Sequence, residues 1–481
     1  DVLGSRGLGD VYKRQLEGST VTLYRMGEEG VPTVDEFLAE KLSENGCLGF
    51  DGRVIGGTWG RRMEKLAEKK NGTIHCNEDL IDIIWEDRPA LSKEPVFILE
   101  EKYAGKSTAE KLAAVREAME KEGADYHILT SLYDIAWLLN VRGGDIECVP
   151  VVLSYLVLTE KECIWFLQEE IVDEKLRAYL NENHITTRSY DAIYEYVLDI
   201  PANAKVLLSA GQVNYRIVSS LNEDITIIDK PNPTLLMKAV KNQTEVDNTR
   251  AAHVKDGVAV TKFMYWIKNN IGKTKITEIS ASDYLENLRK EQENFLGISF
   301  NTISAYGANA AMMHYSATPE SDTELKPEGF LLVDSGGHYY EGTTDITRTF
   351  ALGPITDEMR THFTAVCRSN MNLAHAKFLY GCTGLNLDIL ARGPLWEMGI
   401  DYKCGTGHGV GYLLNVHEGP NGFRWRVVTE RNDSGVLQEG MITTDEPGVY
   451  LEGKYGIRTE NELVCHKSVS YTHLRAHETL R

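Results

Sequence analysis

The chain has 481 residues, of which 42% are hydrophobic and 25% are charged, and its formal net charge is −20. This length predicts two to four domains, and the composition is that of a soluble globular protein. The acidic balance argues against a nucleic-acid-binding protein, which needs a basic face, and against attachment to anionic membranes. We find no apolar run long enough for a membrane span and no signal peptide. Eight cysteines without zinc-type spacing favour free thiols in the cytoplasm.

Both ends of the chain lack the periodicity of the remainder. Residues 1–15 and 468–481 show neither a helical nor a strand period. We expect order to begin with a strand at residues 19–24 and to end near Cys465. We interpret both end segments as translated adapter sequence rather than native protein. Ordinary disordered termini are the alternative.

Residues 16–90 predict part of an α/β domain that lacks its beginning. An amphipathic stretch at residues 34–42 is followed by a buried strand at 47–50 and a helix at 59–67.

Residues 91–233 predict a second α/β domain. Ser107 and Glu110 form the pattern of a capping box, and Gly123 stands where a helix ends. Pro231 and Pro233 then mark a boundary. The predicted strands of this unit are 127–130, 151–158 and 163–167.

Residues 234–467 predict a third and larger unit. The helices expected in it are 244–269, 280–295, 356–378 and a shorter one ending at Gly399, and the strands include 301–306 and 330–334.

Two aspartates lie around a predicted hairpin in this unit. The apolar strand 330–334 ends in Asp334, Ser335-Gly336-Gly337 turns the chain, and the returning segment carries Asp345. A hairpin of this kind can bring two carboxylates together. Aspartates are also common as turn or edge residues, so the pair alone leaves both interpretations open.

Four further ionisable residues follow in three segments that contain glycine or proline. His408 lies in Gly405-Thr406-Gly407-His408-Gly409-Val410-Gly411, where glycines allow close backbone approach, although an incidental histidine in a flexible loop is the alternative. Glu446 precedes Pro-Gly turn chemistry. Arg458 and Glu460 share one side of a strand. Arg458 is therefore a candidate to hold a ligand carboxylate, or else forms a surface ion pair.

Together these residues have the chemistry of a two-metal hydrolase. Four carboxylates and one imidazole can balance two divalent cations, and oxygen-rich sites favour harder ions such as Mn²⁺. His314 and His417 are candidates to move a proton or to stabilise an intermediate, although a lone histidine is more often structural. The predicted metal ligands are Asp334, Asp345, His408, Glu446 and Glu460.

The order Asp…Asp…GTGHGVG…NVHEGP…DEPGVY…GIRTEN resembles the catalytic domain of the pita-bread metallopeptidases. Within them it is most similar to the three-domain, cytosolic form of Xaa-Pro aminopeptidase, also called aminopeptidase P. The similarity extends to the segment DIAWLLNVRG at residues 134–143 and weakly to LGFDG at 48–52. The resemblance implies an α/β (α+β) protein in which two creatinase-N-like domains, the first truncated, precede a pita-bread catalytic domain.

The resemblance also implies roles for individual residues. Asp345 and Glu460 would bridge two metals, Asp334 would complete one shell, and His408 with Glu446 the other. Glu446 would also be the general base.

The same resemblance implies the substrate contacts. His314 and His417 would contact the scissile amide and the intermediate, and Tyr450 and Arg458 would lie near the pocket for proline. Cys404 occupies a substrate-contact position where the family often has histidine, and a thiol is the poorer hydrogen-bond partner.

The expected activity is release of the amino-terminal residue from peptides with proline in second position, by a cytoplasmic homodimer. Because the first domain is incomplete and the family's carboxy-terminal extension is absent, we treat dimer formation as open. A prolidase acting on Xaa-Pro dipeptides is the nearest alternative, and a non-catalytic peptide-binding module is a further one. Creatinase is disfavoured by the full ligand set, and methionine aminopeptidase by the two extra domains.

Overall fold

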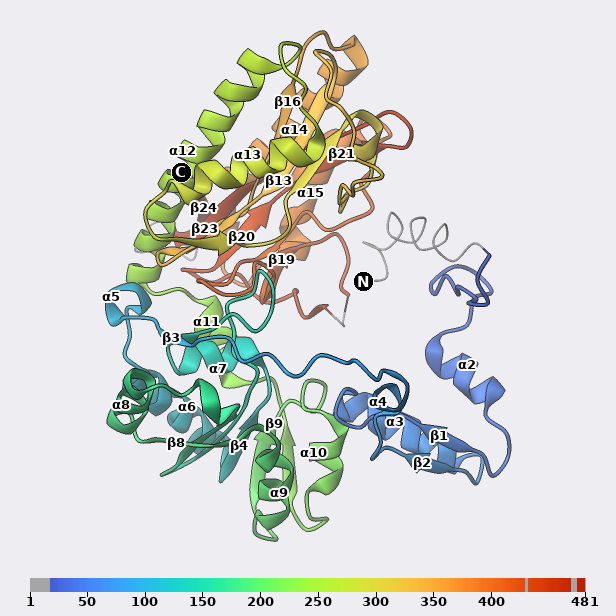
Figure 1. Ribbon diagram of the computed structural model, residues 1–481, viewed down its shortest axis with the longest axis vertical. Helices are drawn as coiled ribbons and strands as arrows, with labels where there is room; N and C mark the ends of the chain where they lie inside the picture. Colours follow the sequence, from blue (N-terminus) through green and yellow to red (C-terminus); the bar gives the residue numbers. More distant parts are fainter. Residues whose placement is uncertain (1–17, 429–430, 469–473, 481) are drawn as a thin grey trace.

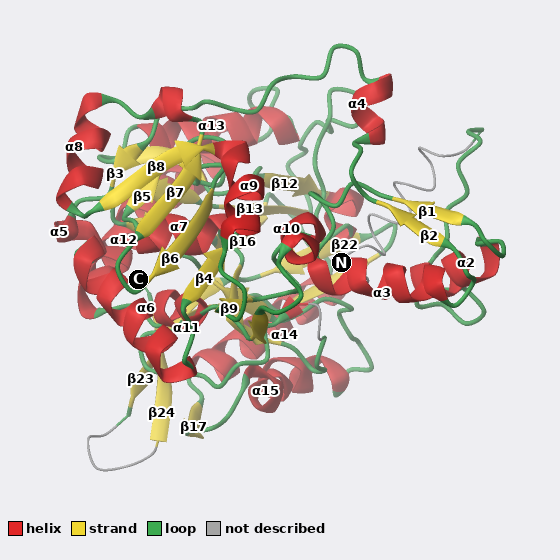
Figure 2. Ribbon diagram, turned by 90° about the horizontal axis from the view of Figure 1, so that it is seen from below, coloured by secondary structure: helices red, strands yellow, loops and turns green. Residues whose placement is uncertain are grey.

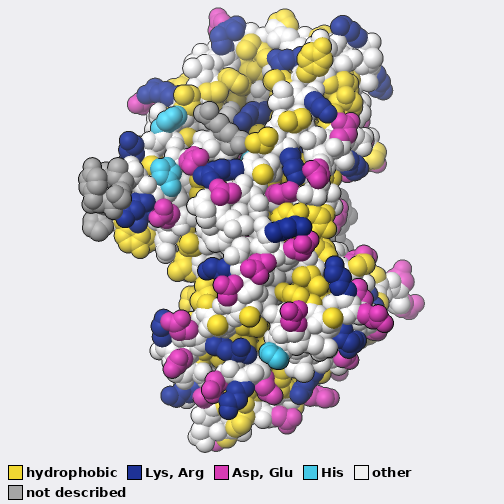
Figure 3. Space-filling view, turned by 90° about the vertical axis from the view of Figure 1, so that its left-hand side faces the viewer, with side chains coloured by type: hydrophobic (Ala, Val, Ile, Leu, Met, Phe, Trp, Pro, Cys, Tyr) yellow, Lys and Arg dark blue, Asp and Glu magenta, His cyan; other side chains and the backbone are white. Residues whose placement is uncertain are grey.

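The computed structural model describes residues 18–428, 431–468 and 474–480. The chain is a mixed α/β protein, as predicted, and its three parts follow one another from blue through green to red in Figure 1. No helix in these described ranges combines the length and the apolar character that crossing a bilayer requires. On the face drawn in Figure 3, acidic side chains lie among basic ones rather than leaving a broad basic surface.

The amino-terminal part is small and open. It consists of α2 (Val34–Lys41), β1 (Cys47–Gly49), α3 (Gly57–Glu68), β2 (Thr73–His75) and α4 (Leu80–Ile84). β1 and β2 form a two-stranded parallel sheet. Two predictions fail here. Residues 19–24 form no strand, because no neighbouring strand pairs with them. Residues 47–49 are not buried, because β1 has only one neighbour and alternates exposed with half-buried positions.

The middle domain is built on a six-stranded sheet, seen from below in Figure 2. Alternation along one strand explains how both faces are filled. Trp165 packs in one apolar cluster and its neighbour Phe166 in the other. In sheet order the strands are β10 (Thr226–Asp229), β9 (Lys205–Leu208), β4 (Tyr126–Leu129), β6 (Tyr155–Thr159), β7 (Cys163–Leu167) and β8 (Ile185–Ser189).

Local sequence patterns set the helices of the middle domain. The capping box of Ser107 and Glu110 begins α6 (Thr108–Glu122), and Gly123 ends it with φ +67°, as predicted. β6 starts four residues later than the predicted strand, because residues 151–154 pair with no neighbouring strand. A further helix of this domain is α7 (Leu132–Leu138), and α11 (Pro233–Ala239) follows its last strand, β10.

The third part contains two main sheets covered by long helices. The sheet β12-β13-β16 consists of Ile303–Tyr306, Phe330–Ser335 and Ile346–Ala351. The six-stranded sheet β17-β24-β23-β20-β18-β19 consists of Lys377–Leu379, Leu474–Thr479, Asn461–Lys467, Ile442–Asp445, Gly407–Gly409 and Glu418–Phe423. The helices are α12 (Gln243–Asn270), α13 (Glu278–Lys290), α14 (Asp357–Ala374) and α15 (Gly384–Trp396), close to the predicted ranges.

Regular structure extends beyond the predicted end near Cys465. β24 pairs antiparallel with β23 and with β17, and the ring of His477 packs against Phe378 and Phe423. The expectation that order stops near Cys465 is wrong, because backbone pairing with an open sheet edge does not require an apolar period. That residues 1–15 and 468–481 are non-native stays a prediction. Residues 1–15 lie outside the described ranges.

A buried ion pair joins α12 to α13 behind the first sheet. Arg289 donates to both oxygens of Asp256, at 2.6 and 3.0 Å, and the hydroxyl of Tyr339 donates to the same carboxylate at 2.9 Å. Arg289→Met should lower the free energy of unfolding by about 3–5 kcal/mol, because it leaves Asp256 charged and buried. Lys262→Met is the control, since the exposed Lys262–Glu291 pair should contribute only about 0–1 kcal/mol. Urea unfolding measures both, and equal losses would contradict the expectation.

Candidate metal centre and substrate cavity

Strand pairing brings the two predicted aspartate ligands to the same end of one sheet. Asp334 is the fifth residue of β13, and Asp345 comes directly before β16. The two strands are antiparallel, with Ser335 opposite Ile346, so the carboxylates meet where the strands diverge. The segment between them pairs separately, as β14 (Gly337–Tyr339) and β15 (Gly342–Thr343).

The predicted histidine and glutamate ligands come from two neighbouring strands of the second sheet. His408 lies in β18, and Glu446 follows β20. Thr444 joins them, because its hydroxyl accepts from the backbone N–H of His408 at 3.0 Å and donates to Glu446 Oε1 at 3.1 Å. Gly407 must be glycine, since a Cβ there would lie 1.9 Å from the carbonyl oxygen of Thr444.

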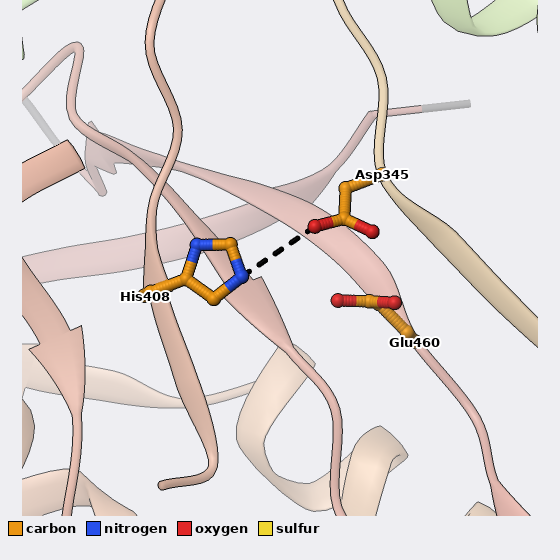
Figure 4. Close-up of side chains that lie close together, drawn as sticks. All are labelled: Asp345, His408 and Glu460. Carbon is orange, nitrogen blue, oxygen red and sulfur yellow. Dashed lines mark ion pairs between the residues drawn. The ribbon is translucent and has the colours of Figure 1, made fainter. Parts of the chain in front are cut away.

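The orientation of the His408 ring suits a ligand. Its Nδ1 lies 2.9 Å from the carbonyl of Gly409, so this nitrogen donates. Nε2 then points at Asp345 Oδ2, at 3.4 Å (Figure 4), and lies 3.5 Å from Glu446 Oε1. A second hydrogen bond that fixes the tautomer is usual for histidines that bind metals.

The last predicted ligand, Glu460, follows the strand β22 (Tyr455–Arg458). The hydroxyl of Thr347 donates to Glu460 Oε2 at 2.6 Å. Arg458 is 2% exposed and donates to Asp334 Oδ2 at 2.5 Å and to the hydroxyl of Tyr450 at 2.7 Å. Its contact with the Asp334 carboxylate is made through one nitrogen.

The buried acidic side chains of this site lack enough neighbouring positive charge to balance them. Burial, together with Asp334 and Glu446, raises the pKa of Asp345 to about 7, although His408 opposes this shift. Burial and the neighbouring acids raise the pKa of Glu460 well above its ordinary value. Burial alone would lower the pKa of His408, but the negative charges of Asp345 and Glu446 have the larger effect and raise this pKa to about 9. Crowded buried acids of this kind are stabilised by cations.

The donor set fits divalent metals. Ligand atoms of Asp345, His408 and Glu460 all lie within 4.8 Å of one another, and Figure 4 shows the three side chains converging. Asp334 Oδ1 is buried and has no hydrogen-bond partner. Oxygen donors with one imidazole suit Mn²⁺ and related ions, and no thiolate lies among the five.

All ten predicted site residues line one cavity of about 540 Å³. The rings of His408 and His417 are 4.3 Å apart in an edge contact. The charge on His408, burial and His314 together lower the pKa of His417 to about 3, and burial with Arg458 lowers that of His314. Both rings are therefore neutral at pH 7, able to donate from one nitrogen and accept at the other. The cavity residues are Asp334, Asp345, His408, Glu446, Glu460, His314, His417, Cys404, Tyr450 and Arg458.

Cys404 faces the cavity as a neutral thiol, because burial raises its pKa to about 12. The guanidinium of Arg392 donates to the carbonyl of Cys404 at 2.5 Å and to that of Tyr402 at 2.5 Å. It also donates to Asp388 at 2.6 Å. Arg392 therefore fixes the backbone from which the thiol projects.

Three residues that position side chains of the site were not recognised from the sequence. Thr347, Thr444 and Arg392 were not predicted as part of the site. A pattern for two of them exists, because alternate residues of a strand share a face. Thr444 stands two residues before Glu446, and Thr347 two residues after Asp345. No comparable pattern marks Arg392, which reaches the site from a helix.

Known proteins match almost the whole chain. Residues 87–245 match the creatinase/prolidase N-terminal domain, and residues 247–467 match metallopeptidase family M24. A probable Xaa-Pro aminopeptidase P of Laccaria bicolor is 37% identical over 91% of this chain and 69% of that relative. A probable Xaa-Pro aminopeptidase P of Coprinopsis cinerea is 37% identical over 94% and 75%.

Solved structures agree with these matches. The X-prolyl aminopeptidase of Caenorhabditis elegans, described as a cytosolic enzyme with a dinuclear active site, superimposes with a TM-score of 0.90 and 32% identity. The match covers 98% of this chain and 78% of that one. A Xaa-Pro dipeptidase from Bacillus anthracis, at 22% identity and a TM-score of 0.63 over 78% of this chain and 97% of that one, shares the fold. The predicted creatinase-N-like and pita-bread architecture is thereby confirmed.

Proposed function

Since the chain belongs to the Xaa-Pro aminopeptidase P family of metallopeptidases, we propose that it removes the amino-terminal residue from peptides whose second residue is proline. Five candidate ligands that line one cavity together with His314 and His417 support this activity most directly. The cavity has room for a short peptide segment but not for a folded protein.

The roles of the side chains follow from their chemistry. Two divalent cations would polarise the scissile carbonyl and lower the pKa of a water molecule, so that hydroxide forms and can attack that carbonyl. The residues that would hold the cations are Asp334, Asp345, His408, Glu446 and Glu460. The nitrogen of an Xaa-Pro bond carries no N–H, so it must gain a proton to leave. Glu446 takes the proton of the attacking water and passes it to this nitrogen.

Neutral imidazoles hold the reacting amide. His417 and His314 donate hydrogen bonds to the carbonyl region, where negative charge develops during attack. Arg458 and Tyr450 form the wall that receives the proline ring. Cys404 replaces an imidazole by a neutral thiol and gives a weaker contact.

The deciding experiment measures release of the first residue from Xaa-Pro-Xaa tripeptides and from Xaa-Pro dipeptides, with Mn²⁺ and after chelation. We expect cleavage of the tripeptide, loss of activity in chelator and recovery with Mn²⁺. Cleavage of dipeptides alone would identify a prolidase instead. A protein that binds no metal at any Mn²⁺ concentration would favour the non-catalytic peptide-binding module.

We further propose Mn²⁺ as the native ion, a homodimer as the assembly and the cytoplasm as the location. The oxygen-rich ligands support the choice of ion. Exposed apolar side chains on α14 and α15 support self-association. These side chains are Met371, Leu385, Ile389 and Trp396. Metal analysis of the purified protein and sedimentation velocity test the first two proposals, which a different bound metal or a monomer at all concentrations would contradict.

A further inference from the structure

A tight turn connects the predicted ligand His408 to His417, and both side chains line the cavity. Residues 410–417 connect β18, with His408, to β19. The backbone N–H of Gly411 donates to the carbonyl of Asn415 at 3.0 Å, and the N–H of His417 donates to Asn415 Oδ1 at 3.0 Å. Leu413, at the tip, has φ +44°. A leucine in this left-handed conformation persists only where its surroundings impose it.

The surroundings of the tip belong to the middle domain. Leu414 is 1% exposed and packs in the apolar cluster that contains Trp137. Tyr412 and Leu413 pack against Leu99. We call residues 410–417 the catalytic loop. The tip of this loop is therefore part of the core of the middle domain.

The side chain of Arg142 binds backbone carbonyls of this tip and so joins the tip to the middle domain. Its side chain is 1% exposed. One edge of the guanidinium donates to the carbonyl of Leu413 and, at 2.9 Å, to that of Tyr412. The third nitrogen donates to the carbonyls of Ala136 and Val141 in its own domain, at 2.9 Å each. The planar fork of arginine suits such a set of fixed acceptors, and lysine cannot reproduce it.

Two further contacts hold the sides of the turn. Asn415 Nδ2 donates to the hydroxyl of Tyr133 on α7, at 2.9 Å. Glu418, the residue after His417, is 8% exposed and lies 2.5 Å from Lys241 Nζ. Lys238 on α11 lies 3.6 Å from Glu418 and 3.4 Å from Asp134 of the middle domain.

We propose that the middle domain places the catalytic loop, with Arg142 and Tyr133 as positioning residues that act through residues 412–415 on His417. The inference rests on the proposed peptidase activity. Arg142 contacts the backbone of the turn, and Tyr133 contacts the side chain of Asn415. The His417 ring stands beside His408 only while the turn stays attached to the middle domain.

Tyr133→Phe tests this coupling, since it removes one hydroxyl and leaves the ring. We expect kcat on an Xaa-Pro-Xaa peptide to fall about five- to tenfold, the effect of one lost hydrogen bond on positioning, with KM and bound metal unchanged. In a His417→Ala background the same substitution should change kcat less than about twofold, because residues that act through one another are not additive.

Controls separate positioning from general damage to the domain. Tyr179→Phe removes a hydroxyl that bonds Leu139 and Thr108 within the middle domain, and it should leave kcat unchanged. Arg142→Lys should lower kcat more than Tyr133→Phe does. If that variant fails to fold, Tyr133→Phe still decides.

Two outcomes would overturn the inference. One is an unchanged kcat in Tyr133→Phe, and the other is an equal fold-loss of kcat from Tyr133→Phe in the parent and in the His417→Ala background. A parent protein that cleaves no proline-second peptide would instead refute the proposed function. The two failures are therefore distinguishable.

Discussion

Glu446→Gln should lower kcat by about a thousandfold or more without unfolding the protein. Positioned general acid–base groups contribute about 10²–10⁴ to rate, and an amide cannot take the proton of the attacking water. Glutamine has nearly the same shape, so Thr444, 3.1 Å from Glu446 Oε1, keeps a hydrogen-bond partner. The measurement is kcat on a proline-second tripeptide at saturating Mn²⁺, with bound metal counted in the same sample.

A matched variant and the metal count make this result specific. Glu452 is an exposed glutamate in the turn after β21 (Gly448–Leu451), and Glu452→Gln should leave kcat unchanged. A Glu446→Gln protein that keeps full activity refutes the assignment of the base. A loss of activity no larger than the loss of metal would mean that Glu446 acts as a ligand only.

The candidate site was more predictable from sequence than the structure around it. Two of the ligands stand beside a residue that constrains the backbone: Gly407 precedes His408, and Pro447 follows Glu446. These constraints are local, so they can be recognised along the chain. Capping of α6 by Ser107 is equally local, and it was also predicted.

What could not be predicted depends on tertiary partners. Residues 19–24 have strand-like composition but find no strand to pair with, whereas residues 474–479 lack an apolar period and still pair with β23. Arg142 was seen only as part of a motif, because its partners Tyr412 and Leu413 are about 270 residues away. Nothing local distinguishes an arginine that binds a distant loop from one on the surface.

The same crowding of acids that favours metal binding should destabilise the metal-free protein as pH rises. The pKa of Asp345 is about 7 in the folded chain and near 3.8 ordinarily, and that of His408 is about 9 instead of 6.5. Both groups therefore hold protons in the folded state that the unfolded chain has released. Stability falls by about 1.4 kcal/mol per pH unit for each such proton, between about pH 4 and 7 for Asp345 and between 6.5 and 9 for His408.

Asp345→Asn should abolish activity, and it should remove the loss of metal-free stability that Asp345 causes as pH rises. In chelator, the variant should melt at a higher temperature than the parent at pH 8, because a neutral amide removes one buried charge and lets the pKa of His408 fall. With Mn²⁺ the parent should instead have the higher melting temperature. A ligand present at a thousand times its Kd stabilises by about 4.1 kcal/mol, and the variant lacks one of the five proposed metal ligands.

Melting curves at pH 6, 7 and 8, in chelator and in Mn²⁺, measure both effects for parent and variant. Asp357→Asn at the exposed start of α14 is the control and should follow the parent in both buffers. In the parent, the Mn²⁺-induced rise in Tm should grow with pH, since binding must displace the protons of Asp345 and His408. A parent whose metal-free Tm does not fall between pH 6 and 8, or an Asp345→Asn variant that Mn²⁺ stabilises as much as the parent, would show that Asp345 neither carries the raised pKa nor binds the ions.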